Sequence, residues 1–298
     1  METTRAVVGL SGGRQVDVWT RNLDRAAALL LHGGTPCSGL PSAAVVAAAD
    51  RARLGYLSYS RPGYGDSTRQ PGRSVADCAA DVAELAGALG VRRLHVVGWS
   101  GGGPHALACA RLLPGLVAST ATIGGVAPWG AEGLDWLAGM GPENVEELGL
   151  AVEGEAALRP WLEREAETLG RVTGPEVAEA LGGLVDAVDR EALTGAFAEE
   201  VAATFREALR TGVWGWLDDD LAFASGWGFE LHTIATPVSV WQGALDRMVP
   251  FDHGRWLAAL VPGATAHLLP DEGHLSLAAT EAKLEVIVRE LVERGGSR

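Results

Sequence analysis

Short apolar runs alternate with helical patterns along the first part of the chain, and the alternation returns near the end. The apolar runs that have the length of buried strands are residues 26–31, 55–60, 94–98, 117–123, 236–241 and 266–269. Buried strands separated by helices build a mostly parallel sheet that is covered by helices on both faces. Residues 5–10 and 15–20 flank Ser11-Gly12-Gly13 and predict a β-hairpin ahead of that sheet. The alternation therefore predicts an α/β fold.

The alternation stops between Trp129 and Trp227, where only helical patterns occur, as in residues 144–152, 175–188 and 196–209. A segment of about 100 residues is too long for an ordinary loop and long enough to form a lid. We therefore predict a sheet domain formed by residues 1–128 and 229–298, with an all-helical cap formed by residues 129–228.

Charge and cysteine content narrow the classes of partner. The formal net charge of −14 disfavours nucleic acid and anionic membranes, both of which require a basic surface. Cys37, Cys78 and Cys109 have no metal-ligand spacing, and the N-terminal stretch METTRAVVGLSGG has no apolar run long enough for a signal peptide. We expect a cytoplasmic monomer or homodimer with reduced thiols, a small-molecule substrate, no metal and no other cofactor.

The pattern Gly-x-Ser-x-Gly occurs twice, around Ser100 and around Ser11. A nucleophile elbow needs a strand, a sharp turn and then a helix. The sequence LHVVG-WSGGG-PHALACARLL supplies all three parts around Ser100. Ser11 is instead followed by the alternating sequence RQVDV, which is typical of a second strand. We therefore predict that Ser100 is the nucleophile and that Ser11 is a hairpin residue.

A serine nucleophile needs a histidine base that is oriented by a carboxylate. Asp246 follows the strand PVSVWQG, and His274 follows the strand AHLLP, so both lie where an open parallel sheet places its active site. Asp252 and Asp271 are the alternatives to Asp246. Asp252 is better explained as a helix N-cap, and Asp271 lies too near His274 in the sequence. The other histidines are assigned to strands, helices or structural loops: His32, His95, His105, His232, His253 and His267.

These motifs together resemble a serine hydrolase of the α/β-hydrolase fold. The motifs that carry the resemblance are HGGTP (32–36), RPGYGDS (61–67), GWSGG (98–102), GALDRMVP (243–250) and Gly273-His274. The resemblance covers the sheet domain from about residue 5 onward, outside the helical insertion. It implies that Ser100 is the nucleophile, that His274 is the general base and acid, and that Asp246 orients the imidazole.

The same resemblance implies an oxyanion hole with two backbone donors. The N–H of Gly101 opens a helix whose N-terminus favours negative charge. The second donor comes from the loop after His32, with Gly34 as our prediction and Thr35 as the alternative.

The insertion and the RPGYGDS loop give weaker predictions. We expect Trp129 and Trp136 to face a hydrophobic substrate pocket, although aromatic residues also fill cores. RPGYGDS is interpreted as a structural turn-rich loop from which Tyr64 touches the site. The run Asp218-Asp219-Asp220 lacks accompanying metal ligands and is interpreted as a solvated helix face.

The resemblance and the residues together predict hydrolysis of a small or medium, uncharged, hydrophobic carboxylic ester through an acyl-enzyme. The alternatives with the same triad are an aminopeptidase or amidase, a carbon–carbon bond hydrolase and a haloperoxidase-like enzyme. Dehalogenase and epoxide hydrolase activities are disfavoured because the nucleophile is a serine. A non-catalytic binder of small ligands is the alternative from a different class.

Overall fold

An eight-stranded sheet forms the core of the chain, with the strand order β1-β2-β4-β3-β5-β6-β7-β8. The structure is a computed structural model that describes residues 2–296. The β1–β2 and β2–β4 pairs are antiparallel, and all the following pairs are parallel. The strands are β1 (Thr4–Gly9), β2 (Gln15–Arg21), β3 (Ala28–His32), β4 (Gly55–Tyr59), β5 (Leu94–Trp99), β6 (Val117–Ile123), β7 (Val238–Gly243) and β8 (Thr265–Leu269). The predicted hairpin and mostly parallel sheet are confirmed.

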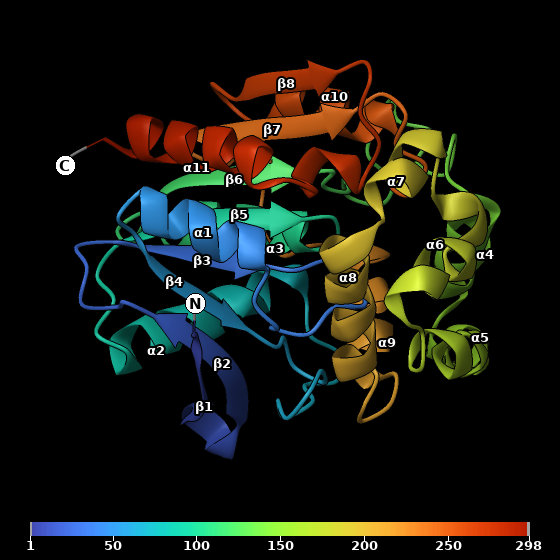
Figure 1. Cartoon of the computed structure of the whole chain (residues 1–298), viewed down its shortest axis with the longest axis horizontal. Helices are drawn as coiled ribbons and strands as arrows, with labels where there is room; N and C mark the ends of the chain where they lie inside the picture. The colour runs from blue at the N-terminus through green and yellow to red at the C-terminus, as the bar shows by residue number, and fades with distance from the viewer. Residues whose placement is uncertain (1, 297–298) are drawn as a thin grey trace.

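Helices cover both faces of this sheet (Figure 1). One face packs on α1 (Ala43–Arg51) and α11 (Glu281–Gly295), and the other packs on α2 (Cys78–Ala88), α3 (Gly102–Leu112) and α10 (Phe251–Leu260). Successive strand residues point to opposite faces, so that Leu30 joins one buried cluster while Leu29 joins the other. The near-continuous apolar strands follow from this burial on both sides.

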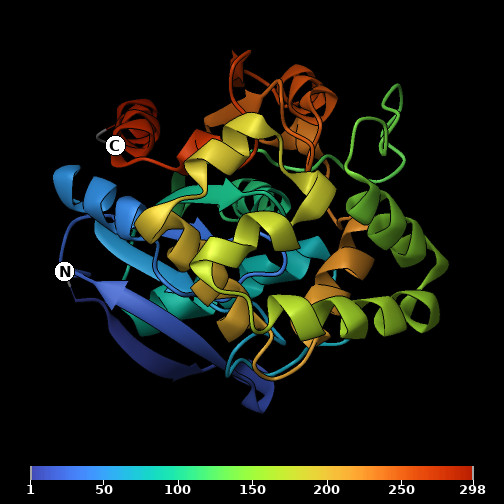
Figure 2. The same ribbon diagram turned by 45° about the vertical axis from the view of Figure 1, so that its right-hand side comes forward.

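The helices between β6 and β7 gather beyond the C-terminal ends of the parallel strands, as Figures 1 and 2 show. We call them the inserted helices: α4 (Pro142–Glu153), α5 (Glu155–Leu169), α6 (Val177–Ala180), α7 (Ala187–Ala192), α8 (Gly195–Ala208) and α9 (Trp214–Phe223). They bury apolar clusters of their own around Leu158 and Val177. They therefore form a layer over the C-terminal ends of the parallel strands.

Two local predictions are wrong. The helix predicted over residues 175–188 is broken into short turns and helices, because Gly182 has a φ of +53° and interrupts the helical path. Asp252 is not the N-cap of α10, which begins after Pro250, and its carboxylate instead accepts a hydrogen bond from Arg255. Among residues 2–296, no helix combines the length and the apolarity that crossing a membrane requires.

Candidate active site

Ser100 occupies a sharp turn between β5 and α3 and has a φ of +55°, which is unusual for a residue with a side chain. The turn leaves no room for side chains at two neighbouring glycines. A Cβ on Gly98 would lie 2.3 Å from the carbonyl oxygen of Gly102, and one on Gly102 would lie 2.1 Å from the carbonyl oxygen of His32. The glycines of the GWSGG motif therefore let the backbone present Ser100 at the end of the sheet.

His274 and Asp246 meet in the neighbouring loops, after β8 and β7 respectively. The Nδ1 atom of His274 lies 2.7 Å from Oδ2 of Asp246, and both side chains are buried. The other oxygen of Asp246 accepts hydrogen bonds from the backbone N–H groups of Met248 and Val249. Both oxygens of the carboxylate thus accept hydrogen bonds within the protein, and the carboxylate fixes the orientation of the imidazole.

The charge around His274 favours its protonated form. Burial alone would lower the pKa of the imidazole, but the charge of Asp246 and its hydrogen bond raise the pKa above the ordinary value. Gly124 allows this close approach, because a Cβ there would lie 2.8 Å from Nδ1 of His274. The imidazolium that forms when a histidine accepts a proton is stabilised by the same charge.

A residue of the inserted helices holds the loop that carries His274. Asp189 of α7 is fully buried and accepts hydrogen bonds from the backbone N–H groups of His274, Leu275 and Ser276, each at 2.9 Å. Its charge also contributes to the raised pKa of His274. Asp189 therefore positions the loop by three bonds to consecutive peptide groups.

The loop after His32 lies against Ser100. A Cβ on Gly34 would lie 3.2 Å from Cβ of Ser100, and one on Gly101 would lie 2.3 Å from Oγ1 of Thr35. Gly34 and Thr35 are both near the serine, so the choice between them as the second oxyanion donor stays a prediction.

Arg61, from the RPGYGDS motif, holds this loop in place through hydrogen bonds to its backbone. Its guanidinium donates to the carbonyl oxygens of Gly33 and Gly34 at 2.7 and 2.6 Å, and to Asp219 at 2.6 Å. Arg73 forms a second ion pair with Asp219 at 2.7 Å. Burial would raise the pKa of Asp219, but the two arginines hold it well below its usual range. α9 is thereby tied to the loop beside the serine.

Tyr64 and Trp129 do not line the cavity above Ser100, contrary to prediction. Tyr64 is fully buried and donates to Asp219, so it belongs to the ion-pair cluster beneath α9. Trp129 packs edge-on against Trp136, with ring centroids 5.0 Å apart. Trp136 does line the cavity, while its indole N–H donates to the carbonyl oxygen of Ala127.

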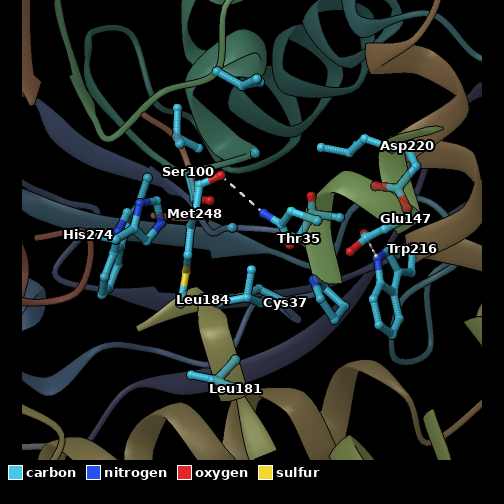
Figure 3. Close-up of a pocket in the computed structure, with 18 of the residues that line it drawn as sticks. Thr35, Cys37, Ser100, Glu147, Leu181, Leu184, Trp216, Asp220, Met248 and His274 are labelled. Atoms are coloured by element: carbon cyan, nitrogen blue, oxygen red, sulfur yellow. Dashed lines mark hydrogen bonds between the residues drawn. The ribbon is translucent and has the colours of Figure 1, made fainter. Parts of the chain in front are cut away.

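The cavity above Ser100 has a volume of about 160 Å³ and a mostly apolar lining. Ser100 and His274 lie at one end, and Glu147, Trp216 and Asp220 lie at the other (Figure 3). Apolar side chains of the inserted helices and of neighbouring loops line the space around them: Val126, Trp136, Met140, Leu148, Leu169, Leu181, Leu184, Val201, Phe205, Phe223, Met248, Val249 and Leu275. The shape and polarity suit an apolar ligand body with one reacting polar group.

The interpretation of Asp218-Asp219-Asp220 as a solvated face is wrong, because all three side chains are buried. Asp218 pairs with Arg69, and Asp219 pairs with Arg61 and Arg73. Asp220 instead lines the cavity beside Glu147. No group of three or more potential ligands that could hold a metal ion occurs in the part of the chain that the structure describes.

The sequence predictions missed Glu147, Asp220 and the positioning residue Asp189. Glu147 and Asp189 are single acids among many in the insertion, and no local pattern distinguishes them. The acidic run does carry a signal of burial, since its helix, WGWLDDDLAF, is otherwise apolar. Acids on an apolar helix are candidates for burial against a counter-charge.

Comparisons with known proteins agree with this geometry. A family model described as alpha/beta hydrolase fold matches residues 28–278. The chain is 29% identical to a pimeloyl-[acyl-carrier protein] methyl ester esterase of Methylococcus capsulatus over 268 residues, which cover 89% of this chain and 93% of that protein. It is 26% identical to an uncharacterized hydrolase of Bacillus subtilis, with 76% and 77% coverage. A thermophilic esterase from Thermogutta terrifontis has a similar fold, with a TM-score of 0.69, 19% identity and complete coverage of both chains.

Proposed function

Because the chain belongs to the alpha/beta hydrolase fold family and is a hydrolase, we propose that it cleaves carboxylic esters through an acyl-enzyme on Ser100. One observation carries the proposal. Ser100 lies on the strained turn at one end of a cavity that His274 also lines, and His274 is paired with Asp246 at 2.7 Å. The relative from Methylococcus capsulatus is a methyl ester esterase, which is consistent with the same bond type.

The proposed reaction has two halves. Oγ of Ser100 bonds to the ester carbonyl carbon while His274 takes the hydroxyl proton, and the oxyanion is held by the N–H groups of Gly101 and Gly34. When the oxyanion collapses, the bond to the alcohol breaks and His274 returns its proton to the departing oxygen. A water molecule then repeats the sequence on the acyl-enzyme and releases the acid.

The substrate is proposed to be small or medium in size, with an apolar body that fills the cavity. The apolar lining supports this body, and no lysine or arginine of the described residues lines the cavity, which disfavours anionic substrates such as phosphates. Residues 129–228 are proposed to act as a cap, since several of the inserted helices contribute cavity-lining side chains. A cytoplasmic location and a monomeric or dimeric state stay predictions.

Labelling with a fluorophosphonate probe, followed by intact-mass measurement, tests the proposal. We expect one adduct on the wild type and none on Ser100→Ala, with hydrolysis of p-nitrophenyl esters lowered at least a thousandfold in the variant. Circular dichroism of the variant provides the folding control. A wild type that is folded but gives neither an adduct nor more than one turnover per chain would favour a ligand-binding protein.

A further inference from the structure

Two buried carboxyl groups stand at the end of the cavity opposite Ser100 (Figure 3). Glu147 comes from α4 and Asp220 from α9, so two separate helices converge on this point. Glu147 is 8% exposed and Asp220 is 1% exposed. Acidic side chains are rarely buried so deeply unless a counter-charge or hydrogen-bond donors compensate them.

The donors present do not satisfy the pair. The indole N–H of Trp216 donates to Oε1 of Glu147 at 2.6 Å. Oδ2 of Asp220 is buried and has no hydrogen-bond partner among the described residues. A buried acceptor without a donor costs free energy, and because Asp220 lines the cavity, a ligand there can supply the missing donor.

Among the described residues, the cation that acts on the pair is already engaged by another acid. Arg73 is the charged group that favours ionisation of Asp220, but it forms an ion pair with Asp219. The remaining charged groups that act on the two acids are themselves acidic, namely Asp219 on Asp220 and Glu165 on Glu147.

Burial and mutual repulsion oppose ionisation of both groups together. Burial raises the pKa of Glu147 to about 7, and burial together with Glu147 raises the pKa of Asp220 well above its usual range. Interacting carboxyl groups in such surroundings titrate as a pair, and the loss of the second proton is strongly opposed. The ionised pair therefore carries a single negative charge that faces an apolar space.

We propose that Glu147 and Asp220 form a subsite for a protonated amine on the substrate. An ammonium group supplies the hydrogen-bond donor that Oδ2 of Asp220 lacks, and its single positive charge matches the charge of the pair. The substrate is then a carboxylic ester or amide whose amine and scissile carbonyl are separated by an apolar body. The proposed substrate is cationic and so departs from the uncharged ester predicted from the sequence, and the kinetic test of the subsite rests on the function proposed for Ser100.

A matched pair of substrates tests the subsite. In p-nitrophenyl 6-aminohexanoate an ammonium replaces the terminal methyl group of p-nitrophenyl heptanoate, and the rest of the two molecules is the same. We expect the wild type to favour the amino ester in kcat/KM by about tenfold to hundredfold, the range typical of a charge-assisted hydrogen bond. Shorter and longer amino esters of the same series then locate the optimum spacing.

The variants Asp220→Asn and Glu147→Gln keep the size of each side chain and remove its charge. We expect each to lower the amino-to-methyl ratio at least tenfold. Asp218→Asn removes the same charge from the same helix, and we expect it to keep the ratio within about threefold of the wild type, because Asp218 does not line the cavity and is paired with Arg69. A wild-type ratio near one, or a ratio that Asp220→Asn and Glu147→Gln leave unchanged, would overturn the subsite.

Binding to the Ser100→Ala protein separates the subsite from the catalytic proposal. Calorimetry with hexylammonium, and with 1-hexanol as the neutral control, requires no catalysis. Preferential binding of the ammonium that Asp220→Asn abolishes supports the subsite even if no ester is turned over. Hydrolysis of esters without such a preference supports the catalytic proposal alone and overturns the subsite.

Discussion

Two buried aspartates, Asp246 and Asp220, have different surroundings: Asp246 pairs with His274 at one end of the cavity, and Asp220 lines the other end. Asp246 accepts hydrogen bonds from His274, from two backbone N–H groups and from Gln242. Asp220 faces Glu147 and keeps one oxygen without a partner. A carboxylate that must orient another side chain is satisfied within the protein, whereas one that is left unsatisfied is available to a ligand.

The two ends also differ in how the chain builds them. The end with Ser100, His274 and Asp246 comes from loops at the ends of neighbouring parallel strands. The end with Glu147 and Asp220 comes from helices that meet only through tertiary packing. The first arrangement follows from the topology of the sheet, and the second depends on how α4 and α9 pack.

The largest expected effect concerns the satisfied aspartate. Asp246→Asn keeps the size of the side chain but allows the wrong imidazole tautomer, and we expect it to lower kcat about ten-thousandfold on ester substrates. Steady-state kinetics with p-nitrophenyl heptanoate measure the loss, and an unchanged circular dichroism spectrum provides the control. A loss below tenfold would show that Asp246 does not orient the base.

The adjacent residues Asp219 and Asp220 sharpen the comparison through stability. Asp219→Asn leaves Arg61 and Arg73 buried without their counter-charge, and we expect a loss of about 3–5 kcal/mol in the free energy of unfolding. Asp220→Asn removes an acid from an acid pair, so we expect a change below about 1 kcal/mol in either direction. Urea unfolding of both variants provides the measurement. Equal losses would contradict the opposite environments of these neighbouring residues.

The smallest expected effect concerns Asp189, which acts on His274 through charge as well as hydrogen bonds. Removing a negative charge lowers the pKa of the imidazole, and the base must be neutral to accept a proton. The acidic limb of the pH profile of kcat/KM therefore moves to lower pH in Asp189→Asn, by less than about one pH unit, because Asp189 contacts the backbone of His274 and not its imidazole. If Asp189 acted only on loop geometry, kcat would fall and the limb would stay in place.

Most of the sheet and the candidate triad could be predicted because their signals are local. Apolar runs of strand length and the turn glycines around Ser100 indicate their structures within a few residues. Asp246 and His274 follow because each comes directly after such a strand.

The far end of the cavity could not be predicted in the same way. Asp218 and Asp219 are buried because they pair with Arg69, Arg61 and Arg73. These arginines precede the aspartates by about 150 residues in the chain, so no local sequence pattern indicates the ion pairs. The prediction that Tyr64 touches the site is wrong for the same reason, because its hydroxyl donates to the distant Asp219. Trp129 and Trp136 show that an aromatic residue near a cavity can line it or support a neighbour that does.

Buried acids of the inserted helices bind groups of the sheet domain, and these contacts limit how the insertion can be exchanged. Asp189 holds the loop of His274, and Asp219 binds Arg61 under the loop beside Ser100. An insertion exchanged with that of a related enzyme would strand Arg61 without its counter-charge unless the incoming segment carried an acid at the same place. The inserted helices and the sheet domain are therefore coupled through these buried acids, and a substitution that spares Asp189 and Asp219 disturbs the site less than a replacement of the whole insertion.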